Sequence, residues 1–135
     1  MNYLFADTFY FIALLSPQDQ AHQRATAIGY SISPRRAILT TAFVLTELAD
    51  SISQHRYREG VMRLFETVRN RKSIRILPPT EELFDAGLTL YGSRRDKDWS
   101  LTDCISFEVM RRFHVTEALT GDKHFEQAGF VALLK

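Results

Sequence analysis

The sequence predicts an α/β fold with a central, mostly parallel sheet of about five strands flanked by helices. Short apolar or β-branched runs alternate with longer segments whose apolar residues recur at helical spacing, a pattern typical of strand–helix–strand crossovers. The 135 residues, of which 45% are hydrophobic and 12% aromatic, suffice for one ordinary core. No repeat, low-complexity stretch or linker divides the chain, so we expect a single domain over residues 1–135.

Five runs have the composition of strands, with aliphatic, aromatic and threonine residues concentrated in them. Pro34 precedes the second run, and Pro78 ends the third because proline is excluded from the interior of a sheet. The predicted strands lie at 3–6, at 37–41, at 73–77, within 114–120 and at 130–134.

Helical spacing predicts seven helices between these strands. The stripe from Val61 to Val68 is the clearest, and together with a second stripe at 83, 84 and 88 it is most simply explained as core, with the alternative that part of either stripe faces a partner. Pro17 ends the first helix, because proline disfavours helical geometry in the preceding residue, and Thr80 is a suitable N-cap for the fifth. The predicted helices lie at 8–15, 18–30, 43–52, 57–71, 80–91, 100–113 and 122–127.

Charge and cysteine content restrict the setting of the protein. Seventeen basic and sixteen acidic residues leave a formal charge of +1, so any nucleic-acid binding must come from a local patch. The single cysteine, Cys104, cannot form an intramolecular disulfide, which suits a reducing compartment. Asp7 and Thr8 interrupt the apolar opening, which is too short to span a bilayer and lacks the features of a signal peptide. We therefore expect a cytoplasmic protein without a membrane segment.

Four acidic residues lie at the boundaries of predicted elements. Asp7 follows the first strand and Asp122 the fourth, while Glu47 and Asp103 lie near the starts of two helices. Ligands of open parallel sheets bind beyond the carboxyl ends of the strands, so we expect the four to converge there. Two carboxylates about 4 Å apart repel by on the order of 4 kcal/mol at an effective dielectric near 20. A cation relieves this repulsion, and carboxylate oxygens suit Mg²⁺ or Mn²⁺ but not zinc.

Each acid also has a purely structural explanation. Asp7 and Asp122 can be N-caps, and Asp103 forms a capping-box pattern with Ser100. Glu47 can lie on a solvated helix face. What favours a common site is the placement of all four acids relative to the predicted strands.

Two basic segments are candidates for RNA contacts. The polar link at 92–99 holds three basic residues and Trp99, whose indole would stack on unpaired bases if exposed, or would pack into the core of an ordinary solvated loop. The run at 69–75 is denser in arginine and lysine, but it lies near the opposite ends of the elements and is expected to be solvated surface.

Other chemistries find little support. The histidines have no metal-like mutual spacing; they are His22, His55, His114 and His124. Cys104 lies inside an apolar helix without an evident base, so we expect a buried structural thiol. The chain has no Gly-rich phosphate loop and no Gly-x-Ser-x-Gly elbow.

The acidic motifs resemble those of the PIN-domain ribonucleases, especially the VapC-like toxins of prokaryotic toxin–antitoxin pairs. In order, the matching segments are Phe5-Ala-Asp7-Thr8, Thr46-Glu47-Leu48, Asp98-Trp-Ser-Leu-Thr-Asp103-Cys-Ile-Ser-Phe107 and Leu119-Thr-Gly-Asp122-Lys-His-Phe125. The third is the most specific, and the order and spacing extend over essentially the full length. The resemblance implies Mg²⁺- or Mn²⁺-dependent cleavage of single-stranded RNA, a cognate antitoxin partner and frequently a homodimer.

By position, the resemblance also assigns residues to roles. The implied catalytic quartet is Asp7, Glu47, Asp103 and Asp122. Its three aspartates would hold the metal, and Glu47 would orient the attacking water. Nearby polar support and a possible accessory acid are Thr8, Thr120 and Asp98. The family often carries another acid shortly after the fourth motif, where this chain has Lys123 and His124, so the resemblance leaves the number of metal ions open.

Two other functions are compatible with such a sheet. A phosphoacceptor receiver domain would need an aspartate after the third strand, where this chain has Leu77-Pro78-Pro79. A catalytically idle PIN domain that binds RNA or protein is the second alternative, and the complete quartet argues against it.

Overall fold

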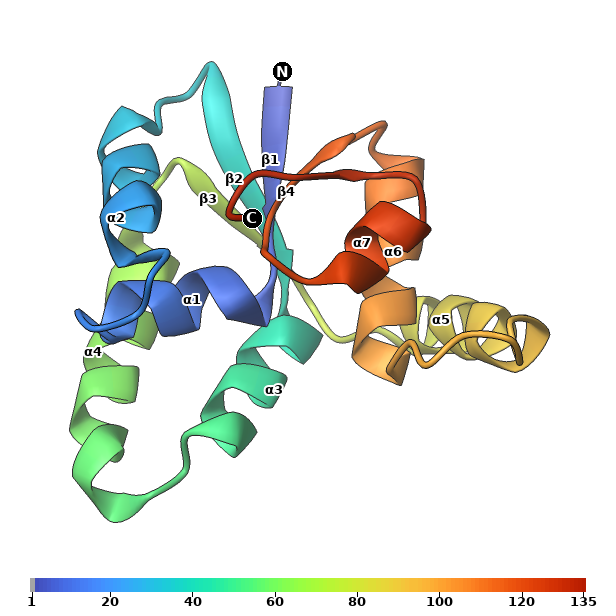
Figure 1. Cartoon of the computed structure of the whole chain (residues 1–135), viewed down its shortest axis with the longest axis horizontal. Helices are drawn as coiled ribbons and strands as arrows, with labels where there is room; N and C mark the ends of the chain where they lie inside the picture. The colour runs from blue at the N-terminus through green and yellow to red at the C-terminus, as the bar shows by residue number, and fades with distance from the viewer. Residues whose placement is uncertain (1) are drawn as a thin grey trace.

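The computed structural model describes residues 2–135 and has, within them, five strands and seven α-helices (Figure 1). The strands are β1 (Asn2–Ala6), β2 (Arg36–Thr41), β3 (Ile74–Leu77), β4 (Glu117–Leu119) and β5 (Val131–Ala132). The helices are α1 (Thr8–Leu15), α2 (His22–Ser31), α3 (Ala42–Ser51), α4 (Arg58–Asn70), α5 (Glu81–Ser93), α6 (Leu101–Arg112) and α7 (Lys123–Gln127), with a 3₁₀ turn, η1 (His55–Tyr57), before α4. The predicted α/β class is confirmed.

All five strands are parallel and follow the order β3-β2-β1-β4-β5. Phe5 of the central strand pairs with Leu39 of β2 on one side and Ala118 of β4 on the other. The chain builds the sheet outward from β1 in one direction, and then returns to build it in the other. Strand order therefore reverses between β1 and β4, the place where open parallel sheets bind ligands.

Helices cover both faces of the sheet. Figure 1 shows α1, α2 and α4 on one side and α5, α6 and α7 on the other, with α3 beyond the carboxyl ends of the strands. The core consists of side chains from the sheet and from both helical layers; the largest fully buried ones include Phe5, Phe11, Ile38, Leu48 and Phe125. A side chain at Gly87 of α5 would place its Cβ 2.2 Å from Ile105, so this glycine lets α5 approach α6 closely.

Several element boundaries differ from the prediction, and two of these differences have a local cause. Helix α2 begins at His22 and not at residue 18, because the Asp19 carboxylate accepts a hydrogen bond from the Ala21 amide at 2.8 Å and holds a turn. Helix α3 follows β2 without a loop, since the Thr41 hydroxyl caps it by accepting from the Val44 amide at 3.1 Å. Strand β5 is only two residues long.

The two apolar stripes behave differently. In α4, Val61 and Val68 are buried, as predicted. In α5, Leu83 is buried, but Phe84 and Leu88 are 40% and 46% exposed, so their explanation as core residues is wrong and the alternative of a partner-facing part stays open. The reason is the position of α5 at the edge of the molecule, where one face packs on α6 and the rest faces outward (Figure 1).

The remaining fold-level expectations concern the basic run and the membrane. Residues 69–75 link the end of α4 to the amino end of β3, so the run lies opposite the carboxyl ends, as expected. Arg75 stacks on the Phe113 ring at 5.1 Å.

Among the described residues, 2–135, every helix is too short or too polar to cross a bilayer.

Candidate active site at the carboxyl end of the sheet

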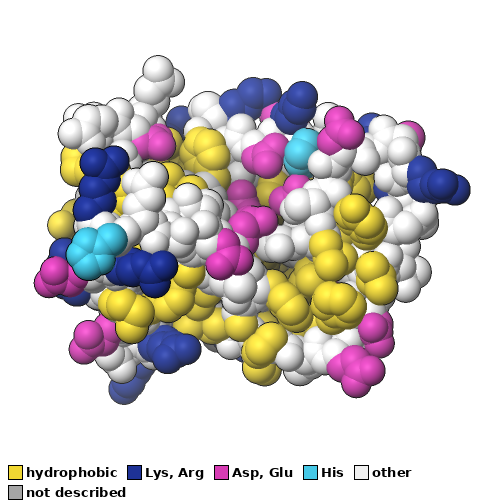
Figure 2. All heavy atoms as spheres, turned by 90° about the horizontal axis from the view of Figure 1, so that it is seen from below, with side chains coloured by type: hydrophobic (Ala, Val, Ile, Leu, Met, Phe, Trp, Pro, Cys, Tyr) yellow, Lys and Arg dark blue, Asp and Glu magenta, His cyan; other side chains and the backbone are white. Residues whose placement is uncertain are grey.

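The four predicted acids line one cavity of about 350 Å³ beyond the carboxyl ends of β1 and β4. Asp7 links β1 to α1, Glu47 lies in α3, Asp103 lies in the first turn of α6, and Asp122 precedes α7. Figure 2 views this end of the molecule and shows Asp and Glu side chains running through the middle of the face, with most Lys and Arg side chains toward its margins. The lining also includes Thr8, Phe9, Ile12, Asp98, Ser100 and His124.

Asp7 occupies the N-cap position of α1 without capping it. Its side chain makes no capping hydrogen bond and instead accepts one from the Thr120 hydroxyl at 2.9 Å. Burial raises the pKa of Asp7 to about 7; the Thr120 hydrogen bond opposes this, and the negative charges of Asp103 and Glu47 add to it. The explanation of Asp7 as a simple helix cap is therefore wrong.

Glu47 points into the cavity and not into solvent. It is half-buried and accepts a hydrogen bond from the Thr8 hydroxyl. Burial raises its pKa, the Thr8 hydrogen bond opposes the rise, and the charges of Asp103 and Asp122 contribute to it. The solvated-face explanation of Glu47 is wrong, and Thr8 lies where a supporting residue was expected.

Asp103 is both a cap and a cavity residue. The Ser100 hydroxyl accepts from the Asp103 amide at 3.0 Å, and the Asp103 carboxylate accepts from the Ser100 amide at 3.2 Å, which completes the predicted capping box. Burial raises the pKa of Asp103, hydrogen bonds from His124 and the Ser100 amide oppose this, and the charge of Asp122 adds to it.

Asp122 caps α7, as one of its two explanations predicted, by accepting from the His124 amide at 2.9 Å. The preceding turn links it to Asp7, because the Thr120 hydroxyl that donates to Asp7 also accepts from the Asp122 amide at 3.1 Å. Gly121 allows this turn to lie against Phe9, since an added Cβ would be 2.6 Å from the Phe9 ring.

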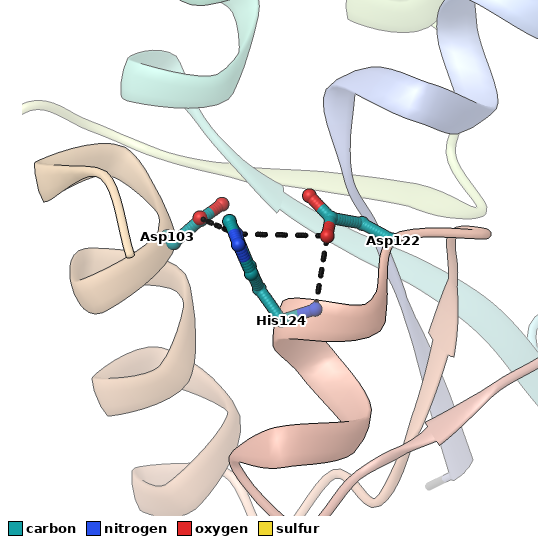
Figure 3. Close-up of side chains that lie close together, drawn as sticks. All are labelled: Asp103, Asp122 and His124. Carbon is teal, nitrogen blue, oxygen red and sulfur yellow. Dashed lines mark hydrogen bonds and ion pairs between the residues drawn. The ribbon is translucent and has the colours of Figure 1, made fainter. Parts of the chain in front are cut away.

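His124 joins the acids, which sequence reasoning missed. Its Nδ1 lies 3.0 Å from Asp103 Oδ2 and 3.6 Å from Asp122 Oδ1, with the ring between the two carboxylates (Figure 3). One histidine therefore belongs to the acidic cavity, although the four histidines have no metal-like mutual spacing in the sequence. The one available signal was the position of His124 immediately after the fourth motif, where the family often has an acid.

The remaining candidates occupy three different positions. Asp98 is exposed but lines the cavity. Trp99 is buried, with its indole N–H donating to Gln127 at 3.0 Å, so the explanation as an exposed base-stacking platform is wrong. Cys104 is buried, as expected, and burial raises its pKa to about 11, which makes its thiol a poor nucleophile.

The donor set of this cavity suits a hard or borderline divalent cation. Within residues 2–135, the ion pairs of the four acids with basic side chains involve only His124, so most of their charge lacks a basic partner. Ligand atoms of Asp103, Asp122 and His124 lie within 4.8 Å of one another, close enough for one ion. Carboxylate oxygens are the ligands that Mg²⁺ and Mn²⁺ prefer. The residues present therefore fit such a metal.

Comparison with known proteins agrees with this geometry. The family model for the PIN domain matches residues 4–131. No curated protein sequence matches the chain significantly.

Several solved structures share the fold. The chain is similar to VapC20 of Mycobacterium tuberculosis, described as a sarcin–ricin loop cleaving toxin, with 25% identity, a TM-score of 0.81 and coverage of 98% of this chain and 99% of that one. FitAcB from Neisseria gonorrhoeae has 20% identity, a TM-score of 0.67 and coverage of 98% and 96%. VapBC2 from Rickettsia felis, bound to a DNA fragment from its promoter, has 12% identity, a TM-score of 0.67 and coverage of 98% of this chain and 96% of that one.

Proposed function

The chain belongs to the PIN domain family, and we propose that it is a metal-dependent endoribonuclease that cleaves single-stranded RNA as the toxin of a toxin–antitoxin pair. The observation that carries the proposal is the convergence of Asp7, Glu47, Asp103 and Asp122 on one cavity. The similarity to VapC20, a toxin that cleaves an RNA loop, supports the same class of substrate. Single-stranded loops and ends present unstacked bases that a protein can splay out and read, which a paired RNA helix does not offer.

The proposed mechanism divides the work among the four acids. Asp7, Asp103 and Asp122 would hold one or two ions of Mg²⁺ or Mn²⁺. Such ions, when bound, would neutralise charge on the phosphodiester and lower the pKa of water. Glu47, held by Thr8, would orient the attacking water and accept its proton. In-line attack by water on phosphorus would leave a 5′-phosphate and a 3′-hydroxyl.

Support for the acids comes from neighbouring polar groups. Thr120 holds Asp7 in place through a buried hydrogen bond of 2.9 Å. Asp98 lies at the exposed side of the cavity, where it would act as an accessory acid toward a second ion or toward ordered water.

The test is cleavage of a single-stranded RNA by the purified protein. We expect cleavage with Mg²⁺ or Mn²⁺, none with EDTA, and a loss of about 100-fold or more in Asp7→Asn and Asp103→Asn, as when one group that stabilises transition-state charge is removed. Asp50→Asn is the matched control, because Asp50 is an exposed acid of α3 that does not line the cavity. Cleavage that survives in both site variants would overturn the proposal.

The proposed partners are an antitoxin and a second copy of the chain, in the cytoplasm. The structures of the FitAcB and VapBC2 assemblies support an antitoxin. The acidic cavity is suited to Arg or Lys from such a partner, since arginine binds carboxylates through paired hydrogen bonds. Exposed apolar residues on α5 support self-association; they are Phe84, Leu88 and Tyr91.

Two experiments separate these partners. Co-expression with the neighbouring small gene should give a stable complex and relieve growth arrest; if that protein neither co-purifies nor relieves the arrest, the toxin assignment fails while the nuclease assignment stands.

Light scattering of the purified chain should give a dimer that Leu88→Glu converts to monomer. A monomeric wild type would exclude the dimer.

A further inference from the structure

We propose that His124 supplies a nitrogen ligand to the metal ion of this site, and that the site consequently prefers Mn²⁺ to Mg²⁺. The inference rests on the proposed function, because it concerns the same metal. It goes beyond that function by assigning a residue that the acidic motifs do not contain and by choosing between the two ions.

The first argument is the spacing of possible ligand atoms. The Nδ1 of His124 lies 3.0 Å from Asp103 Oδ2 and 3.6 Å from Asp122 Oδ1. Neighbouring ligands of an octahedral ion at about 2.1 Å lie roughly 3.0 Å apart, and opposite ligands roughly 4.2 Å. The two distances therefore match or approach those between neighbouring ligands of one ion, and the three ligand atoms together lie within 4.8 Å.

The second argument is that the chain holds the ring in this place. The His124 amide donates to Asp122 Oδ1 at 2.9 Å, so the backbone of the first turn of α7 fixes the start of the side chain. The side chains of His124 and Asp103 are only 20% and 9% exposed, and the ring lies between the carboxylates of Asp103 and Asp122 (Figure 3). Binding an ion would exchange the Nδ1 hydrogen bond to Asp103 for a bond to the metal.

A nitrogen ligand changes which ion the site favours. Mg²⁺ prefers oxygen ligands and retains water, whereas imidazole is a good ligand for transition metals. Mn²⁺ accepts both carboxylate and imidazole, so the mixed set of Asp103, Asp122 and His124 favours Mn²⁺ over Mg²⁺. A set of carboxylates alone would discriminate less between the two ions.

The deciding experiment is electron spin-echo spectroscopy on the Mn²⁺-loaded protein, which detects directly bound nitrogen and does not depend on RNA cleavage. We expect a ¹⁴N coupling in the wild type, its loss in His124→Gln, and its retention in His55→Gln, whose histidine is exposed in η1. A wild-type spectrum without ¹⁴N coupling would overturn the inference, and so would a coupling that survives in His124→Gln.

Calorimetric titration with Mn²⁺ and Mg²⁺ gives an independent measurement. Loss of the nitrogen ligand in His124→Gln should weaken Mn²⁺ binding by about 10-fold or more, with a much smaller change for Mg²⁺. His124→Asp keeps a ligand at the same position, and should raise Mg²⁺ affinity relative to Mn²⁺. Equal losses for both ions in His124→Gln would show that His124 only positions Asp103.

The outcomes separate this inference from the proposed function. Metal-dependent RNA cleavage without a ¹⁴N coupling would overturn the inference of a nitrogen ligand and leave the proposed nuclease function standing. Mn²⁺ bound through His124 in a protein that cleaves no RNA would support the inference of a nitrogen ligand and overturn the proposed nuclease function. Absence of Mn²⁺ binding by calorimetry would remove the inference.

Discussion

The two halves of the acidic cavity are held in place by different means. The acids from the first half of the chain, Asp7 and Glu47, accept hydrogen bonds from the hydroxyls of Thr120 and Thr8. Those from the second half accept hydrogen bonds from backbone amides at the amino ends of helices. Asp103 accepts from the Ser100 amide in the capping box of α6, and Asp122 accepts from the His124 amide as the N-cap of α7. The first pair therefore contributes charge to the cavity without supporting a helix, whereas the second pair does both.

This difference affects how each half responds to substitution. Asp7 carries the energetic cost of burial, since burial raises its pKa to about 7. Asp103 and Asp122, in contrast, also stabilise helices, and both lie against His124. Activity assays alone cannot distinguish the two halves, but stability and its dependence on pH and metal can.

The largest effect is expected in the pH dependence of metal binding. A proton on Asp7 competes with the ion, so Mn²⁺ affinity should fall about tenfold per pH unit as the pH drops below about 7, the raised pKa of Asp7. Between pH 7 and pH 5 this amounts to on the order of 100-fold. Calorimetry in Asp7→Asn should show a shallower dependence; an equally steep one would place the competing proton elsewhere.

The stability of the metal-free protein should fall as the pH rises. Because the pKa of Asp7 is raised from 3.8 to about 7 on folding, the folded state binds more protons than the unfolded state between these values. Unfolding free energy should therefore decrease from about pH 4 to pH 7, by at most about 1.4 kcal/mol per pH unit for this group. Denaturant titrations in EDTA measure the slope, and Asp7→Asn should flatten it. A wild-type stability that rises over this range would contradict the account.

Removal of a cap should distinguish the halves at constant pH. Asp122→Ala removes the acceptor for the His124 amide and should cost about 1 kcal/mol. Asp122→Asn retains an acceptor and should cost only a few tenths of a kcal/mol. A small effect of the Ala variant in denaturant titrations would show that Asp122 is not needed as a cap.

The smallest expected effect concerns the hydrogen bond that holds Asp7. Thr120→Val removes the hydroxyl that lowers the pKa of Asp7, so this pKa should rise further. A hydrogen bond worth about 1 kcal/mol corresponds to a shift of roughly 0.7 pH unit. The pH at which RNA cleavage or Mn²⁺ binding is half-maximal should move upward by this amount. An unchanged midpoint would show that Thr120 does not influence Asp7.

Much of the fold and the quartet could be predicted from sequence because the relevant signals are local. Each strand is a short apolar run, and each acid lies at an element boundary or in the early turns of a helix. The capping box at Ser100 and Asp103 was visible because its residues are three positions apart.

The features that could not be predicted depend on tertiary packing. Asp7 makes no side-chain capping bond to α1, and its Oδ2 accepts instead from Thr120, 113 residues away. His124 reaches Asp103 only because α7 packs beside α6, across 21 residues of sequence. The exposure of Phe84 and Leu88 follows from the position of α5 at the edge of the molecule, which helical periodicity does not encode.

The measurement that tests most directly whether the acids of both halves share one metal is a set of thermal melts. Wild type and Asp7→Asn are compared at low salt and pH 8, each in EDTA and in excess Mn²⁺. Without metal, removing the charge of Asp7 relieves repulsion by Asp103 and Glu47. The variant should therefore be more stable by about 1 kcal/mol, or roughly 3 °C for a chain of this length. With Mn²⁺, the wild type should gain more than the variant, because only a native-state site is stabilised by ligand binding. An unchanged or lower melting temperature of the metal-free variant, together with equal responses to Mn²⁺, would show that Asp7 does not belong to a metal site.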